Sequence, residues 1–272
     1  SSNLAIAADK HIFLSFLDFL TVSHSSASAK DVEHNFKSLF NSMIESLVPI
    51  LKSISFEQMS LDEQSQIYVH VSNIIIHSCP DLFEHDRKDD IEKCCAILRF
   101  FDGYLFPNLK LEELFVEALV DGALSTKIRR VEHLEFGLFL VDHVFKRGLK
   151  VDNIKEDPIQ KIADIIVIPM SEFQSRFYLT VFKRCLDEGY GRDLGQHLLN
   201  LVSPYGGSFA LDVEPYVELL IRAGADINVC NSHGETPFML VLKNELNNMS
   251  LFRLLVQSGS DLTLEDNSHN TC

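Results

Sequence analysis

Three glycines at positions 189, 191 and 195 are of the residue type that loops use to bind phosphate groups. The dinucleotide-binding pattern G-x-G-x-x-G directly follows a β-strand, and its third glycine comes three residues after the second. Here the third glycine comes one position later, and the residues before Gly189 have a helical pattern. We therefore interpret Gly189, Gly191 and Gly195 as a helix end with its loop, and we predict no cofactor.

Possible metal ligands occur between residues 70 and 95. They are His70, His77, Cys79, Cys94 and Cys95. A structural zinc site uses two pairs of ligands, each separated by a few residues. His77 and Cys79 are too close together for this, and the adjacent Cys94 and Cys95 point to different sides of a helix. Because a free cysteine commonly behaves as a small buried apolar residue, we predict no metal site.

Acidic pairs are the remaining candidates for catalysis. They are Asp89–Asp90, Glu112–Glu113 and Asp187–Glu188. General acid–base catalysis needs carboxylates in one pocket with separated pKa values, whereas adjacent residues on a helix diverge into solvent. No serine, cysteine or histidine lies in a nucleophile motif such as G-x-S-x-G. We predict no catalytic residue and no enzymatic activity. An enzyme with a pocket between an N-terminal helical domain and the C-terminal part remains an alternative.

Composition limits the partners. The 272 residues are 46% apolar and carry 24 basic and 39 acidic side chains, a formal net charge of −15. Such a charge disfavours nucleic acid and anionic lipid and favours a protein partner with a basic surface. No apolar stretch approaches the roughly 18 residues of a membrane span. The six scattered cysteines suggest reduced thiols, so we predict a cytoplasmic or nuclear protein without a small-molecule ligand.

Apolar residues at three- and four-residue spacing predict helices along nearly the whole chain. Ser60 with Glu63 forms a capping-box pattern, and Asp157 followed by Pro158 marks another helix start. The predicted helices cover residues 30–53, 60–79, 89–101, 111–124, 130–147, 158–167, 171–186, 194–202 and 215–223. With few glycines and prolines and no period-two pattern of useful length, the sequence predicts an all-α fold.

A repeated helix ending organises the C-terminal half. Glycines follow a helical pattern at positions 148, 189, 224 and 259, which are spaced by 41, 35 and 35 residues. Glycine can adopt the left-handed conformation that closes a helix C-terminus. Recurrence near 33 residues is typical of stacked helix pairs, which bury their apolar faces only against their neighbours.

The last two of these units resemble the ankyrin repeat. The resemblance rests on Gly224-Ala-Asp-Ile-Asn228, which is similar to the family's helix end, and on Asn231-Ser-His-Gly-Glu-Thr-Pro-Phe238, which is similar to its turn and next helix start. The next unit keeps Asp261, Asp266 and Thr271 at the same offset of 35 residues. Two departures are Met239 in place of the usual histidine, which removes a hydrogen bond between repeats, and extra residues at 244–248.

A second resemblance concerns the N-terminal part. Phe13, Phe16 and Phe19, followed by a helix centred on Phe36 and Leu39 and by closing ankyrin-like repeats, resemble the C-terminal half of the feminization (Fem) proteins. Those proteins are substrate receptors of cullin-RING ubiquitin ligases. The resemblance implies, as an alternative function, a fragment of such a receptor, although the elongin-binding box is not among the 272 residues.

Together these observations predict a helical domain at residues 1–110 and an ankyrin-like helical repeat solenoid at 111–272, with the most regular repeats at 213–272. The ankyrin resemblance implies an adaptor that binds another protein through turn tips and inner helices. The predicted contact residues are Ser232, His233, Glu235, Met239, Asn267, Ser268 and His269.

Overall fold

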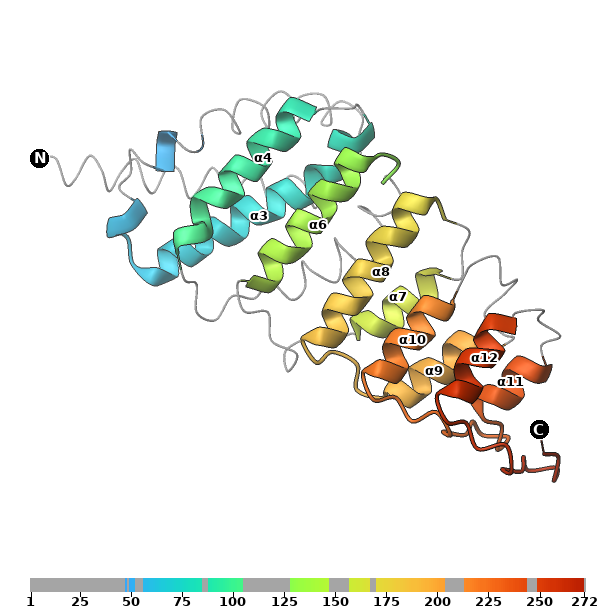
Figure 1. The fold of residues 1–272 in the computed structure, drawn as a ribbon. Coiled ribbons are helices and arrows are strands. Elements are labelled where there is room, and N and C mark those ends of the chain that lie inside the picture. The colour runs from blue at the N-terminus through green and yellow to red at the C-terminus, as the bar shows by residue number, and fades with distance from the viewer. Residues whose placement is uncertain are drawn as a thin grey trace, which may run out of the picture. The chain divides into compact units, whose positions relative to one another are not determined.

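The chain forms two compact units, Ser1–Lys150 and Val151–Cys272. This computed structural model describes residues 47, 49–51, 56–84, 88–104, 128–146, 157–166, 170–203, 213–243 and 249–271. Every regular element among these residues is a helix, which confirms the predicted all-α class (Figure 1). The division falls after Lys150 rather than after the predicted residue 110, because α6 (Val131–Lys146) packs on α4 (Lys88–Phe100).

The helices α4, α6, α7, α8, α9 and α10 begin and end within one residue of the predicted positions, whereas α3 ends later and α11 and α12 had no predicted range. Unit 1 contains η1 (Phe56–Gln58), α3 (Leu61–Glu84), α4 (Lys88–Phe100), η2 (Phe101–Gly103) and α6 (Val131–Lys146). Unit 2 contains α7 (Pro158–Ile166), α8 (Glu172–Asp187), α9 (Leu194–Val202), α10 (Glu214–Arg222), α11 (Pro237–Lys243) and α12 (Met249–Gln257). The predicted helix at 111–124 lies outside the described residues, as does all of 30–53 except residues 47 and 49–51.

In unit 1, α3 begins at the predicted capping box. The Ser60 N–H donates to Glu63 Oε2 at 3.0 Å, and the Glu63 N–H donates to Ser60 Oγ at 3.4 Å. The predicted end before Pro80 is wrong, because α3 continues to Glu84. A proline in a helix interior removes one backbone hydrogen bond and costs about 3 kcal/mol. α3 contacts α4.

Edge-to-face aromatic contacts form the core of unit 1. Phe101 is fully buried, and its ring lies 5.5 Å from that of Phe56 and 5.2 Å from that of Tyr68. These three rings join η1, α3 and η2, and α4 contacts both α3 and α6. Aromatic residues in this geometry stabilise beyond their buried area, by about 0.5–1.5 kcal/mol a pair.

Unit 2 has a side-chain cap at the start of four of its helices. Asp157 precedes α7, Ser171 precedes α8, Asp193 precedes α9 and Thr236 precedes α11, and each accepts a hydrogen bond from a backbone N–H of the first helical turn. Such caps satisfy N–H groups that have no partner within the helix. Because a cap is a local sequence feature, the starts of α7, α8 and α9 agree with the predictions to within one residue.

In the described part of unit 2, the helices form three pairs: α7 with α8, α9 with α10, and α11 with α12. Neighbouring pairs contact each other in two rows. The first helices form the row α7–α9–α11, and the second helices form the row α8–α10–α12 (Figure 1). Each row buries apolar side chains that one pair alone would leave in contact with water.

The second helix of each pair ends in the same way. Gly189, Gly224 and Gly259 have φ angles of 84°, 96° and 98°. Each glycine N–H donates to the carbonyl three residues earlier, and the next N–H donates to the carbonyl five residues earlier. This left-handed closure satisfies the last carbonyls of the helix. The recurrence predicted from the sequence is therefore present at 189, 224 and 259, while Gly148 lies outside the described residues.

A buried polar cluster connects the first two pairs. His197 of α9 is 5% exposed; its Nε2 lies 2.9 Å from Asp157 Oδ2, and its Nδ1 lies 3.1 Å from Gln160 Oε1. The Arg192 N–H also donates to Asp157. Burial alone would raise the pKa of Asp157, but the hydrogen bonds from His197, Ile159 and Arg192 outweigh it and lower the pKa. Asp157 thus caps α7 and also holds α9 against it.

We predict that Gly224→Ala destabilises the protein by about 1 kcal/mol, because a residue with a Cβ loses about 1–2 kcal/mol in the left-handed conformation. A Cβ at position 224 would meet no atom within 4 Å, so the loss is conformational and not steric. Gly103→Ala is the matched control, because position 103 is equally open and has no positive φ. Urea unfolding should show the control to be at least as stable as the parent protein. An equal effect of the two substitutions would contradict the left-handed closure.

We predict that Asp157→Ala costs about 2–3 kcal/mol, because it removes a helix cap and leaves buried partners without their acceptor. Asp193→Ala removes only the cap of α9 and should cost about 1 kcal/mol. The difference in unfolding free energy between the two variants measures the contribution of the contact between α7 and α9. If both variants lost the same stability, His197 would not depend on Asp157.

Candidate functional site

The loops that follow α10 and α12 have the same hydrogen-bonding pattern. We call residues 224–236 the first loop and residues 259–271 the second loop. In the first loop, Asn231 Oδ1 accepts from the N–H groups of His233 and Glu235, both at 2.9 Å. In the second, Asp266 Oδ1 accepts from Ser268 at 2.8 Å and from Asn270 at 2.9 Å. The two acceptors, Asn231 and Asp266, are 35 residues apart, so the two loops contain the same turn.

Each loop contains a left-handed residue at the same place. Gly234 has φ 76° in the first loop, and His269 has φ 61° in the second. A Cβ at Gly234 would come within 2.7 Å of Asn267 Oδ1, so the approach of the second loop requires glycine there. The side chain of His269 is 86% exposed and has no following loop to clash with among the described residues.

Three hydrogen bonds fasten the second loop to the first. The Asn267 N–H donates to the His233 carbonyl at 3.0 Å, and Asn267 Nδ2 donates to the Ser232 carbonyl at 3.1 Å. The Asp261 N–H donates to Asn228 Oδ1 at 2.8 Å. Two of these bonds are accepted by backbone carbonyls and the third by the Asn228 side chain, so the side chains of Ser232 and His233 remain exposed. The loops are therefore held in register while their tips remain accessible.

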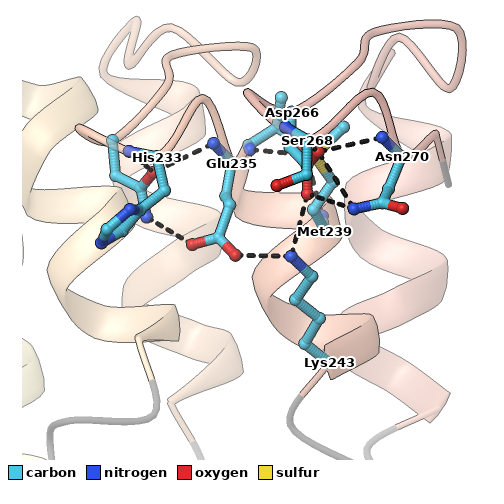
Figure 2. A network of polar contacts seen from close by, with 9 residues as sticks. His233, Glu235, Met239, Lys243, Asp266, Ser268 and Asn270 are labelled. Carbon is cyan, nitrogen blue, oxygen red and sulfur yellow. Dashed lines mark hydrogen bonds and ion pairs between the residues drawn. The ribbon is translucent and has the colours of Figure 1, made fainter.

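Lys243 of α11 forms ion pairs with both loops (Figure 2). Its Nζ lies 2.6 Å from Glu235 Oε1 and 3.1 Å from Asp266 Oδ2. Hydrogen bonds from Lys243 and Asn231 lower the pKa of Glu235. Hydrogen bonds from Asn270, together with those from Lys243 and Ser268, hold the pKa of Asp266 far below its ordinary value. The two carboxylates in turn raise the pKa of Lys243, so all three groups are charged at neutral pH.

Of the predicted contact residues, five are exposed, Glu235 is partly exposed and Met239 is buried. Ser232, His233, Asn267, Ser268 and His269 are exposed at the loop tips. Glu235 is only partly exposed, and its carboxylate accepts hydrogen bonds from Lys243 Nζ and Asn231 Nδ2. Whether these residues contact a partner remains a prediction.

The expectation that Met239 lies on the surface is wrong. Met239 is 4% exposed, and its sulfur accepts a hydrogen bond from the Thr236 N–H. A flexible, apolar methionine fits this buried position of α11. Met239 therefore does not belong to the accessible loop surface.

Sequence reasoning missed Lys243, Asp266 and Asn270 as parts of this network. The 35-residue offset already paired Asn231 with Asp266, so the shared turn could have been inferred from the sequence. Lys243 gave no such signal, because it lies eight residues after Glu235 and meets it only when the loop folds back over α11.

The described residues show few features of a catalytic or metal site. Among them, no cluster of three or more metal-ligating side chains occurs, and no helix could cross a membrane. Cys94, Cys95, Cys185 and Cys230 are free thiols, and burial raises the pKa of Cys94 and Cys185. Thiols of raised pKa are poor nucleophiles at neutral pH. Phe13, Phe16, Phe19, Phe36 and Leu39, which carry the Fem resemblance, lie outside the described residues.

No protein-family model matches the chain, and comparisons with curated proteins and with solved structures find no significant match. The function is therefore inferred from the geometry of unit 2.

We predict that Asp266→Asn preserves the second loop, because Asn231 builds the same turn with an amide oxygen, whereas Asp266→Ala disrupts it. Both variants lose the ion pair with Lys243. Chemical shifts of the Ser268 and Asn270 amides should change little in Asp266→Asn and strongly in Asp266→Ala. Large shifts in both variants would contradict the shared turn.

The same residue should contribute to acid sensitivity. Because the pKa values of Asp266 and Glu235 are lowered on folding, their contribution is fully present above their unfolded pKa, near pH 4. It is lost as the pH falls through the lower folded values. Asp266→Asn should therefore lose less stability than the parent between pH 5 and pH 2 in urea titrations. An unchanged pH dependence would argue against the charged network.

Proposed function

We propose that unit 2 is an ankyrin-like stack that binds another protein through the tips of its loops, residues 232–233 and 267–269. The observation that carries the proposal is the position of these side chains: they project from two loops that bond to each other through the carbonyls of Ser232 and His233 and through the side chain of Asn228. The side chains of Ser232, His233, Ser268 and His269 form none of these bonds between the loops, whereas the Asn267 side chain donates to the Ser232 carbonyl. In stacked-repeat proteins, this separation lets the contact residues vary while the stack is preserved.

The rigidity of the loops supports a role in recognition. Each tip is fixed by an Asx-type turn, by bonds to the neighbouring loop and by the ion pairs of Lys243. A surface that is ordered before binding loses less conformational entropy when a partner docks. A flexible loop of the same composition would lose more, so the network favours binding over a role as a simple connection.

The charge near the tips suggests the character of the partner. Asp261 and Glu265 are exposed on the second loop, and the chain as a whole carries a net charge of −15. A partner with a basic surface would be attracted at long range and oriented on approach. Salt should therefore slow association more than it speeds dissociation.

The test is a triple variant, Ser232→Ala with His233→Ala and Ser268→Ala, used as bait in quantitative affinity purification. None of these three side chains forms a hydrogen bond within the described structure, so the melting temperature should stay within about 1 °C of the parent. We expect at least a tenfold loss of the partners that the parent protein retains.

The control replaces Lys183 of α8 and Gln257 of α12, two exposed residues on the second-helix row, with alanine. It should retain the same partners as the parent. If the triple variant retained them as well, the loop tips would not be the binding surface.

A further inference from the structure

The exposed large apolar residues of unit 2 are concentrated at one end of the stack. Within the described residues they are Leu242, Met249, Val256 and Leu262, with exposures of 45%, 58%, 39% and 44%. All four belong to α11, α12 or the second loop, which form the last pair described. The pairs α7–α8 and α9–α10 present no comparable group among the described residues.

Leu242 occupies a position that is buried in both preceding pairs. It is the sixth residue of α11, and the sixth residues of α7 and α9 are Ala163 and Leu199. Ala163 is 4% exposed and Leu199 is 2% exposed, whereas Leu242 is 45% exposed. The difference is that α7 is covered by α9 and α9 is covered by α11. Among the described helices, none packs on α11 as α11 packs on α9, and the exposure of Leu242 accompanies this difference.

Two residues related by the 35-residue offset follow the same trend. Val256 corresponds to Ile221, and Leu262 corresponds to Ile227. Both isoleucines are only partly exposed, while Val256 and Leu262 are exposed. Burying Val256 and Leu262 as their counterparts are buried would remove apolar surface from water, which stabilises by roughly 25 cal/mol per Å².

The second loop also has hydrogen-bond acceptors that no other described loop uses. The second loop donates to the carbonyls of Ser232 and His233 and to the side chain of Asn228 in the first loop. The counterparts of these acceptors in the second loop are Asn267, Ser268 and Thr263, which are all exposed. Within the described part of the chain, no backbone N–H donates to the carbonyls of Asn267 or Ser268.

We infer that the end face formed by Leu242, Val256 and Leu262 is a docking surface for a further helix pair of the same repeat type. The occupant would carry a leucine- or valine-rich face toward α11 and α12. Its loop would offer one backbone N–H to the Ser268 carbonyl, as Asn267 does to His233. The pair α11–α12 docks on α9–α10 in this way, so the inference extends an interface that is already present.

A second copy of this chain is a poorer occupant. Each copy would bring a net charge of −15, and like charges at this level oppose association. The inference depends on the stacking of helix pairs and not on binding at the loop tips. If the triple variant at the loop tips kept its partners, the proposed function would fail but the inference about the end face would stand.

The test adds such a pair to the full chain. A second copy of residues 237–272 is joined directly after Thr271, which stands 35 residues after Thr236 and so continues the register. We expect the extended protein to melt at least about 5 °C higher than the parent, because the added pair would bury the apolar side chains of the end face.

The double substitution Leu242→Asp with Val256→Asp in the original pair separates docking from other effects. It should lower the melting temperature of the parent by less than about 2 °C, because both residues are exposed there. In the extended protein it should abolish the gain. The control pair Leu61→Asp and Val131→Asp, exposed apolar residues of unit 1, should affect both proteins equally.

Two results would overturn the inference. One is an extended protein that melts no higher than the parent or that keeps its gain after the double substitution. The other is a parent protein that sedimentation equilibrium shows to be a dimer, and that the double substitution converts to a monomer. The second result would make another copy of the chain the occupant of this face.

Discussion

No helix pair of unit 2 can bury its apolar side chains alone, and this constraint governs the rest of the unit. Three second helices stop at a left-handed glycine with identical hydrogen bonds, so each pair presents its neighbour with the same geometry. That identity allows first helices to pack on first helices and second helices on second helices. The loops then meet at a fixed register, and their backbone groups can bond from one to the next.

Polar contacts specify which neighbour fits. Between the first two pairs, Asp157 combines a helix cap with a contact to His197. Between the loops, Lys243 meets one carboxylate from each. Exposed ion pairs contribute little by themselves, but a network held by hydrogen bonds fixes geometry more strongly than it adds stability. These contacts fix the conformation of the loop tips.

Much of this arrangement was predictable because its signals are local. Caps at Asp157 and Ser171 and the recurring glycines mark helix ends with little dependence on the rest of the fold. What could not be predicted depends on tertiary packing. Met239 lies on the buried side of α11, α3 continues past Pro80 to Glu84, and Lys243 meets Asp266 only after the loops stack. The exposure of Leu242 likewise became visible only by comparison with Ala163 and Leu199.

Amide hydrogen exchange at the loops tests the stacking most directly. The N–H groups of Asn267 and Asp261 lie in exposed turns but donate across to the first loop, at 3.0 and 2.8 Å. In a stacked protein they should exchange far more slowly than the amide of Ser232, which has no such bond among the described residues. Exchange at Asn267 and Asp261 as fast as at Ser232 would mean that the loops do not hold one another, and the stacked arrangement would be refuted.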